Sequence, residues 1–224
     1  MAKMNMKCMI VALFLSIGIL DSETVYSLGW TGNNLDGLPC EGQGQGYGPY
    51  DYTNPYDYNK MLPRVEQAHF NSNVERLIGG VHLPSPVPDL DYTLRAFPNH
   101  HKALYAIVRY QLRLNKNPRR YKPIKTSAEC YLNRAIKFKP DDGVVYQLYG
   151  IYLHRLKRYK SALDMYKKAE KYISGSSEIY YNIGLLLYDM KKFRESAVYA
   201  RMAVDKGYPL HALQHKLSKR GFKF

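Results

Sequence analysis

The chain has 224 residues and carries 33 lysines and arginines against 19 aspartates and glutamates, which gives a formal net charge of +14 at neutral pH. A chain of this length can bury a core without the help of a metal or a disulfide, so neither is required for folding. The excess of positive charge favours anionic partners and carries no information about the fold.

Residues 1–27 have the layout of a secretory signal peptide. Lys3 and Lys7 precede a run of about 13 apolar residues, and Val25–Ser27 resembles a small-residue cleavage site. The run is shorter than the about 20 residues that cross a bilayer as a helix. We therefore expect a signal peptide and a periplasmic or secreted protein. An uncleaved membrane anchor is the alternative, because the segment has no A-x-A triplet.

Removal of residues 1–27 would leave two cysteines, Cys40 and Cys130, in an oxidising compartment. An even number of cysteines there favours a disulfide. Such a bond would close a loop of about 90 residues and stabilise the fold by about 4 kcal/mol in the chain-entropy account. The alternative is two free thiols, with Cys130 buried as a small residue in a helix.

Residues 28–60 form a segment rich in Gly, Asn and Tyr, in which turn-forming residues interrupt any periodicity. The sequence predicts loop or extended chain here. Five tyrosines lie between Tyr47 and Tyr58. Because a tyrosine buries a large area and keeps a polar tip, we expect this arm to pack onto the folded body.

Two short amphipathic helices are expected at Arg64–Phe70 and Asn73–Ile78, followed by a linker that contains GG and PSPVPDL. Segment 28–88 is thus an arm with short helices and a Pro-rich linker. Residues 28–98 carry 4 basic and 8 acidic side chains, whereas residues 99–224 carry 27 and 9. A cationic C-terminal module therefore follows a mildly acidic leader.

The segment from residue 89 to the end contains an internal repeat with a period of 34 residues. Residues of similar kind recur at that offset in five pairs: Tyr146 and Tyr180, Gly150 and Gly184, Tyr159 and Phe193, Ala162 and Ser196, and Ala169 and Ala203. One period earlier stand Ala128 and Ala135. This pattern resembles the tetratricopeptide repeat family, whose unit is a helix–turn–helix. In such a unit the small residues let two helices approach closely, and large ones fill the gaps between units.

The resemblance implies an all-α fold, a superhelix of antiparallel helix hairpins that spans 89–224. It has about three repeats, at 101–142, 143–176 and 177–210, and a cap helix at 210–220. Leu210, Leu213 and Leu217 share one face of that cap helix. The first repeat departs from the pattern, since it has about eight extra residues, NPRRYKPI, and Val108 where the family has glycine.

Two histidine pairs invite a metal-site interpretation. Asn99 follows a proline and precedes a helical pattern, so it is the expected N-cap of a helix whose first turn holds His100 and His101. Adjacent helical side chains diverge by about 100°, so these rings do not easily chelate one ion. His211 and His215 share a helix face, but no carboxylate or cysteine accompanies them. We expect no metal site.

Catalysis has no support in the sequence. No GxSxG, P-loop, CxxC or dinucleotide-binding motif occurs, and GQGQGYG lacks a flanking strand and helix. The acidic pairs, Asp89 with Asp91 and Asp141 with Asp142, are more simply helix-start or turn residues. We expect no enzyme and no cofactor.

The resemblance also implies a concave groove, lined by the first helix of each repeat, that grips peptides or partner helices. Twelve residues occupy the groove positions: Lys102, Tyr105, Arg109, Arg113, Gln147, Ile151, His154, Arg155, Tyr181, Asn182, Leu185 and Tyr188. Their mixture of cationic and aromatic groups suits an acidic protein segment. The predicted function is an exported scaffold or adaptor that binds another protein through a basic groove.

Other partners stay open. Residues 41–60 of the arm could occupy the groove intramolecularly. The cationic module could instead bind anionic lipid or polysaccharide at an envelope surface. Nucleic acid is a weaker candidate, because the repeat pattern assigns several tyrosines to packing and an exported protein seldom meets nucleic acid.

Overall fold

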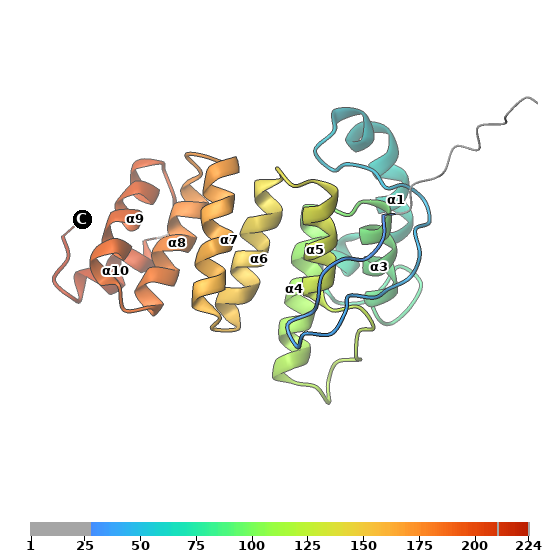
Figure 1. The fold of residues 1–224 in the computed structure, drawn as a ribbon, viewed down its shortest axis with the longest axis horizontal. Coiled ribbons are helices and arrows are strands. Elements are labelled where there is room, and N and C mark those ends of the chain that lie inside the picture. The colour runs from blue at the N-terminus through green and yellow to red at the C-terminus, as the bar shows by residue number, and fades with distance from the viewer. Residues whose placement is uncertain (1–27, 210, 224) are drawn as a thin grey trace, which may run out of the picture.

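A computed structural model describes residues 28–209 and 211–223 of the chain. Within these residues the prediction of an all-α fold is confirmed, with ten α-helices, one π-helix and no β-strand. The helices form a row that runs from the N-terminal group around α1 and α3 to α10 at the opposite end (Figure 1). In chain order they are η1 (Asp57–Met61), α1 (Leu62–His69), α2 (Ser72–Arg76), α3 (Val87–Ala96), α4 (His101–Lys116), α5 (Ala128–Phe138), α6 (Gly143–Arg155), α7 (Tyr159–Tyr172), α8 (Ser177–Asp189), α9 (Phe193–Asp205) and α10 (Ala212–Ser218).

The second half of the row consists of two helix pairs, α6 with α7 and α8 with α9, and each pair packs closely along its length. The first helices of the pairs, α6 and α8, begin at Gly143 and Ser177, which are one repeat period apart. The second helices, α7 and α9, begin at Tyr159 and Phe193 and have the same offset. The period of the residue types is therefore also the period of the helix boundaries.

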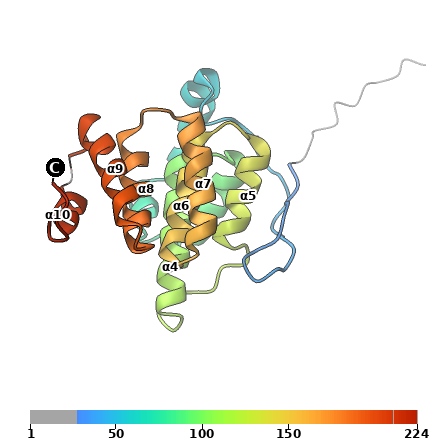
Figure 2. The same cartoon turned by 60° about the vertical axis from the view of Figure 1, so that its left-hand side comes forward.

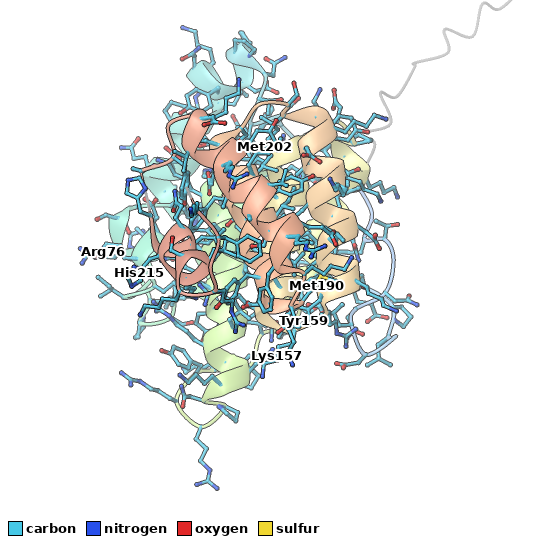
Figure 3. All side chains as sticks on the ribbon, turned by 90° about the vertical axis from the view of Figure 1, so that its left-hand side faces the viewer. Arg76, Lys157, Tyr159, Met190, Met202 and His215 are labelled. Carbon is cyan, nitrogen blue, oxygen red and sulfur yellow. A yellow bond between two sulfur atoms is a disulfide. The ribbon has the colours of Figure 1, made fainter. Side chains whose placement is uncertain are left out.

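The turn inside each of these pairs has the same backbone. Lys157 and Lys191, again separated by one repeat period, adopt left-handed φ angles of 60° and 62°. That conformation costs a residue with a side chain about 1–2 kcal/mol, so packing on both sides must hold it in place. Figure 3 looks along the row and shows Lys157, Tyr159 and Met190 towards the same end of the helix pairs.

Glycine allows the close approach of helices in this half. A Cβ on Gly150 of α6 would lie 2.5 Å from Cδ1 of Tyr166 in α7. A Cβ on Gly184 of α8 would lie 2.7 Å from Cδ2 of Leu213 in α10. In α4 the corresponding residue is Val108, and α4 meets α5 along a shorter stretch than the later pairs share.

The N-terminal helices extend the row, with α1 packed on α3 and α3 packed on α4. α3 begins at Val87, inside the PSPVPDL run, so the prediction of a linker there is wrong for its last residues. Pro86 lies at the N-cap and Pro88 in the first turn. A helix has no backbone hydrogen bond to lose at these positions, which is why the prolines are tolerated.

α4 is capped by His100 rather than by Asn99, which corrects the expected cap. The Nδ1 of His100 accepts a hydrogen bond of 3.2 Å from a backbone N–H of the first turn. Asn99 is buried one residue earlier, and its Oδ1 accepts from the backbone N–H of Tyr52 at 2.9 Å. Its Nδ2 donates to the carboxylates of Asp51, at 2.8 Å, and Asp142, at 3.0 Å. Asn99 therefore joins the arm to two helix junctions.

The arm packs against α5, beside which its blue segment lies in Figures 1 and 2. Cys40 of the arm and Cys130 of α5 are joined by a disulfide with an S–S distance of 2.02 Å. The ring of Trp30 packs edge-on against Tyr131, with centroids 5.2 Å apart. Segment 28–50 is thus attached to the body both covalently and by aromatic packing.

Arg134 of α5 is the main polar link between the arm and the body, although the residue is only 1% exposed. Its Nε donates to the carbonyl of Leu28 at 3.1 Å, and its Nη1 donates to that of Leu94 at 2.8 Å. Its Nη2 donates to Oε1 of Gln45, and the guanidinium lies 5.2 Å from the Trp30 ring centroid. Burial lowers the pKa of Arg134 to about 10, so the side chain stays charged at neutral pH.

No helix in residues 28–209 or 211–223 combines the length and the apolar character that crossing a bilayer requires. The predicted signal peptide, residues 1–27, lies outside the described residues. α10 falls within the predicted cap helix and buries Leu213 and Leu217 completely. Leu210, the third leucine of that prediction, also lies outside the described residues.

Candidate functional site

The twelve residues at the predicted groove positions lie on α4, α6 and α8, which contact one another in that order. We call this set the A-helix face. Two members, Gln147 and Tyr181, are buried. The other ten have side chains that are at least partly exposed: Lys102, Tyr105, Arg109 and Arg113 on α4, Ile151, His154 and Arg155 on α6, and Asn182, Leu185 and Tyr188 on α8.

The α4 end of the A-helix face is covered by α2. Arg109 donates from Nη2 to the backbone carbonyl of Glu75, and its guanidinium lies 4.8 Å from the ring centroid of Tyr105. The Nε of Arg109 is buried and has no hydrogen-bond partner within the described part of the chain. A residue predicted to bind a partner is therefore already engaged by the protein's own backbone.

The α8 end of the A-helix face is covered by α10 and the residues around it. The hydroxyl of Tyr188 accepts a hydrogen bond of 3.1 Å from Nε of Arg220. The ring of Tyr181 stacks on Tyr208 with centroids 4.2 Å apart. In Figure 3, Arg76 of α2 and His215 of α10 lie on the same side of the row. Short helices thus flank the face at both ends.

The centre of the A-helix face lies between these two covered ends. Ile151 and Leu185 are partly buried apolar side chains there, and Arg155 is exposed. Nε2 of His154 lies 2.9 Å from Oδ2 of Asp189, which links α6 to the end of α8. The side-chain Nδ2 of Asn182 is buried without a hydrogen-bond partner among the described residues. The centre therefore combines apolar surface, one cation and one unused donor.

Residues 41–60 of the arm lie elsewhere. The ring centroid of Tyr52 is 4.5 Å from that of His100 and 4.8 Å from that of His101. Nε2 of Gln45 donates to the backbone carbonyl of Arg95 at 2.7 Å. Within the described contacts, this part of the arm reaches α3, α5 and the start of α4, but no side chain of the A-helix face.

Burial controls ionisation where the arm meets the start of α4. It lowers the pKa of His100, against the effect of the Glu66 carboxylate that lies 3.1 Å from Nε2 of His100. It raises the pKa of the Tyr52 phenol. Burial alone would raise the pKa of Asp51, but hydrogen bonds, first among them that from Thr53, lower it. These shifts keep the histidine and the phenol neutral and the aspartate ionised.

Most of the histidines and acids considered for metal or acid–base chemistry have structural partners. Nε2 of His101 lies 2.8 Å from Oδ2 of Asp142, which also caps α6. Nδ1 of His211 lies 3.3 Å from Nε2 of Gln214, and Asp141 pairs with a lysine. Across residues 28–209 and 211–223, no three His, Cys, Asp or Glu side chains are arranged to hold a metal ion.

A cavity of about 880 Å³ lies outside the A-helix face. Three segments far apart in the chain meet around it: the arm at Gly42 and Gln43, residues 82–95, and residues 122–126. His69 and Tyr131 complete the lining. Sequence reasoning missed this site because each segment supplies only a few residues and no fixed spacing connects them.

Two carboxylates line this cavity, and each already has partners. Oδ1 of Asp89 lies 2.9 Å from Nδ1 of His69, and its Oδ2 accepts from a backbone N–H at 2.8 Å. Asp91 accepts from Nε of Arg95 at 2.9 Å and from the hydroxyl of Tyr131 at 2.6 Å. Burial and the nearby Asp91 charge raise the pKa of the Tyr131 phenol, so it remains a donor. The two acids hold the cavity wall together.

The described residues thus offer two candidate surfaces, the A-helix face and the cavity, which share no residue. No model of a known protein family matches the chain, and no curated protein matches it. Geometry and charge are therefore the grounds for choosing between the surfaces.

Proposed function

We propose that the protein is an exported, non-catalytic scaffold built from tetratricopeptide-like repeats, and that its A-helix face binds an acidic segment of another protein. The observation that supports this most is the single period shared by residue types, helix boundaries and turn backbone in α6–α9. A single helix pair of this kind cannot bury its apolar side alone, so pairs stack and present their first helices as one continuous surface.

The centre of the A-helix face has chemistry that such a segment would need. Arg155 stands four residues after Ile151, so the two side chains share one side of α6. A guanidinium can pair with a carboxylate through two hydrogen bonds. Apolar contact at Ile151 and Leu185 would supply the buried anchor that interfaces usually require. Arg113 adds positive charge on α4.

Two further observations support the remaining parts of the proposal. The titratable side chains of His100, His101 and Asp142 are used in helix caps and junctions, which favours a structural role over catalysis. The Cys40–Cys130 disulfide suits the periplasm or the extracellular space, where such bonds persist.

The test is charge reversal on the face, compared with the same reversal on the other helices. Arg113→Glu with Arg155→Glu changes the A-helix face, whereas Lys160→Glu with Arg194→Glu makes an equal change of charge on α7 and α9. Full-length tagged chains would be crosslinked in the cells that produce them, and the captured proteins identified by mass spectrometry. We expect a partner that wild type and the α7/α9 variant retain and the face variant loses. A partner retained equally by both variants would reject the A-helix face.

A second function, binding to an anionic surface of lipid or polysaccharide, is favoured by a specific charge cluster. Between Asp91 and Glu129 the chain has nine lysines and arginines and no aspartate or glutamate. Five of them are exposed at the end of α4 and in the loop that projects beyond it (Figure 1): Lys116, Arg119, Arg120, Lys122 and Lys125. A basic residue near an anionic membrane contributes about 1 kcal/mol, so Arg119→Gln with Arg120→Gln should lower affinity for anionic vesicles about thirtyfold. Unchanged vesicle binding would reject this function.

A further inference from the structure

The cavity is a second site, independent of the proposed scaffold function. Its volume of about 880 Å³ lies within the range of about 300–1,000 Å³ that small-molecule sites occupy. The repeated helices α6–α9 contribute no residue to its lining. The lining comes instead from the arm, from residues 69–95, and from the loop and helix start at 122–131. Segments outside the helices of the second and third repeats therefore converge on one hollow.

One wall of the cavity is apolar and aromatic. The rings of His69 and Tyr92 stack with centroids 3.9 Å apart, and the guanidinium of Arg95 lies 5.4 Å from the Tyr92 centroid. Leu83 and Val87 also line the cavity, and Leu83 is 54% exposed. Exposed apolar surface inside a concave site is the usual sign of a ligand with an apolar body.

The loop at 122–126 contributes positive charge to the lining. Lys122 and Lys125 are exposed, and neither side chain has an acidic partner among the described contacts. The backbone beneath them is held, because Ile124 packs on the core and the carbonyl of Lys122 accepts from the hydroxyl of Tyr110 at 3.1 Å. The direct partners of Asp89 and Asp91 are His69 and Arg95, each at 2.9 Å, and not these lysines.

We propose that this cavity binds an amphiphilic organic anion. Its apolar body would pack on Tyr92 and Val87, and its single acidic group would pair with Lys122 and Lys125. Two lysines that have no direct acidic partner among the described contacts, beside an apolar hollow, match such a molecule, because the acidic group stays at the wet rim while the body leaves water. A fatty acid, a free aromatic acid and the C-terminus of an apolar peptide share this chemistry.

Trp30 gives a local readout for the test. It is the single tryptophan of the sequence, and its ring centroid lies 5.2 Å from that of Tyr131, a lining residue. The probe is 8-anilinonaphthalene-1-sulfonate, which has an aromatic body and one acidic group. Its emission would be measured while tryptophan is excited, so that energy transfer favours the probe bound near Trp30 and the variants below separate the cavity from other binding.

Three kinds of variant test the charge of the lining lysines, the effect of overall charge on the protein, and the space inside the cavity. Lys122→Gln with Lys125→Gln should weaken probe binding about tenfold, as expected if each lost pair contributes about 0.7 kcal/mol. Lys137→Gln with Lys160→Gln removes the same charge from exposed helix positions outside the lining and should leave binding unchanged. Ser85→Phe and Val87→Phe, made separately, should each reduce the transfer signal by filling the cavity, with helical circular dichroism confirming the fold.

Competition identifies the source of the acidic group. Decanoate, indole-3-acetate and a short apolar peptide with a free C-terminus would each be titrated against the probe, and the same peptide with an amidated C-terminus should compete far less. The proposal is overturned if the two lysine pairs behave alike, if neither filling variant lowers the signal, or if no competitor displaces the probe. Arg113→Glu with Arg155→Glu should not affect the signal, so a failed scaffold proposal would leave this result intact.

Discussion

Loss of the Cys40–Cys130 disulfide should lower the free energy of unfolding by about 4.6 kcal/mol. The two cysteines are 90 residues apart, and for a loop of that length the chain-entropy relation gives about 15.5 cal/mol/K, or about 4.6 kcal/mol at 25 °C. The variant is Cys40→Ser with Cys130→Ser, made in a Cys8→Ser background so that no third thiol can exchange. Trp30 and Arg134 still hold the arm in the folded state, so the effect acts mainly on the unfolded chain.

Urea denaturation followed by helical circular dichroism measures this loss. In a domain of this size each kcal/mol of lost stability lowers Tm by about 2–4 °C, so in a thermal scan the variant should melt about 9–18 °C below the disulfide-bonded chain. Its dependence on urea should also be steeper, because the unconstrained unfolded chain exposes more surface. The Cys8→Ser chain in reducing agent serves as control and should match the serine variant. A loss below about 1 kcal/mol, or a reduced control that keeps full stability, would refute the reasoning.

Three further predictions concern single side chains. Arg134→Leu should lower the free energy of unfolding, measured by urea denaturation, by about 3 kcal/mol or more, because a buried carbonyl and two other acceptors lose a charged donor. A decrease of less than about 1 kcal/mol would contradict the assigned contacts. Gly150→Ala should lower the free energy of unfolding by about 1–3 kcal/mol, because the added Cβ would meet the buried Tyr166. Gly44→Ala is the control, since a Cβ there has open space and should leave the stability unchanged. Equal effects of the two substitutions would contradict the close packing. Burial lowers the pKa of His100 in the folded state below its ordinary value of 6.5. As the pH falls below 6.5, the unfolded chain therefore binds a proton at His100 more readily than the folded chain does. The free energy of unfolding of the wild type should therefore decrease on acidification. His100→Asn keeps a capping side chain but removes this titration. The difference in free energy of unfolding between wild type and this variant should therefore shrink as the pH falls through 6.5. A difference that stays constant with pH would exclude the pKa shift.

The periodic part of the chain was the easiest to predict. A side chain on Gly150 or Gly184 would collide with Tyr166 or Leu213, so the need for a residue without a Cβ appears once in each of these repeats and is visible as a pattern. The helix boundaries of α6–α9 follow the same spacing. Val108 in place of glycine was equally visible, and it accompanies the looser meeting of α4 and α5.

The aperiodic part was harder because its structure depends on contacts between distant segments. Asn99 was a reasonable N-cap by residue type, but Asp51 and Asp142 use its side chain, and His100 caps the helix instead. The prolines at the start of α3 suggested a linker, although the first turn of a helix tolerates proline. The cavity has no local signal at all, since its lining is assembled from segments that are distant in the chain.

The linear arrangement of the helices makes the two ends of the molecule unequal. From α6 onward each helix is packed mainly on its immediate neighbours. A crosslink and a buried cation secure the α5 side of the row, whereas in the described part of the chain the other side is closed by the seven-residue helix α10 and the short segments around it. Opening should therefore spread inwards from the tail, and backbone amides of α10 and α9 should exchange with deuterium well before those of α5.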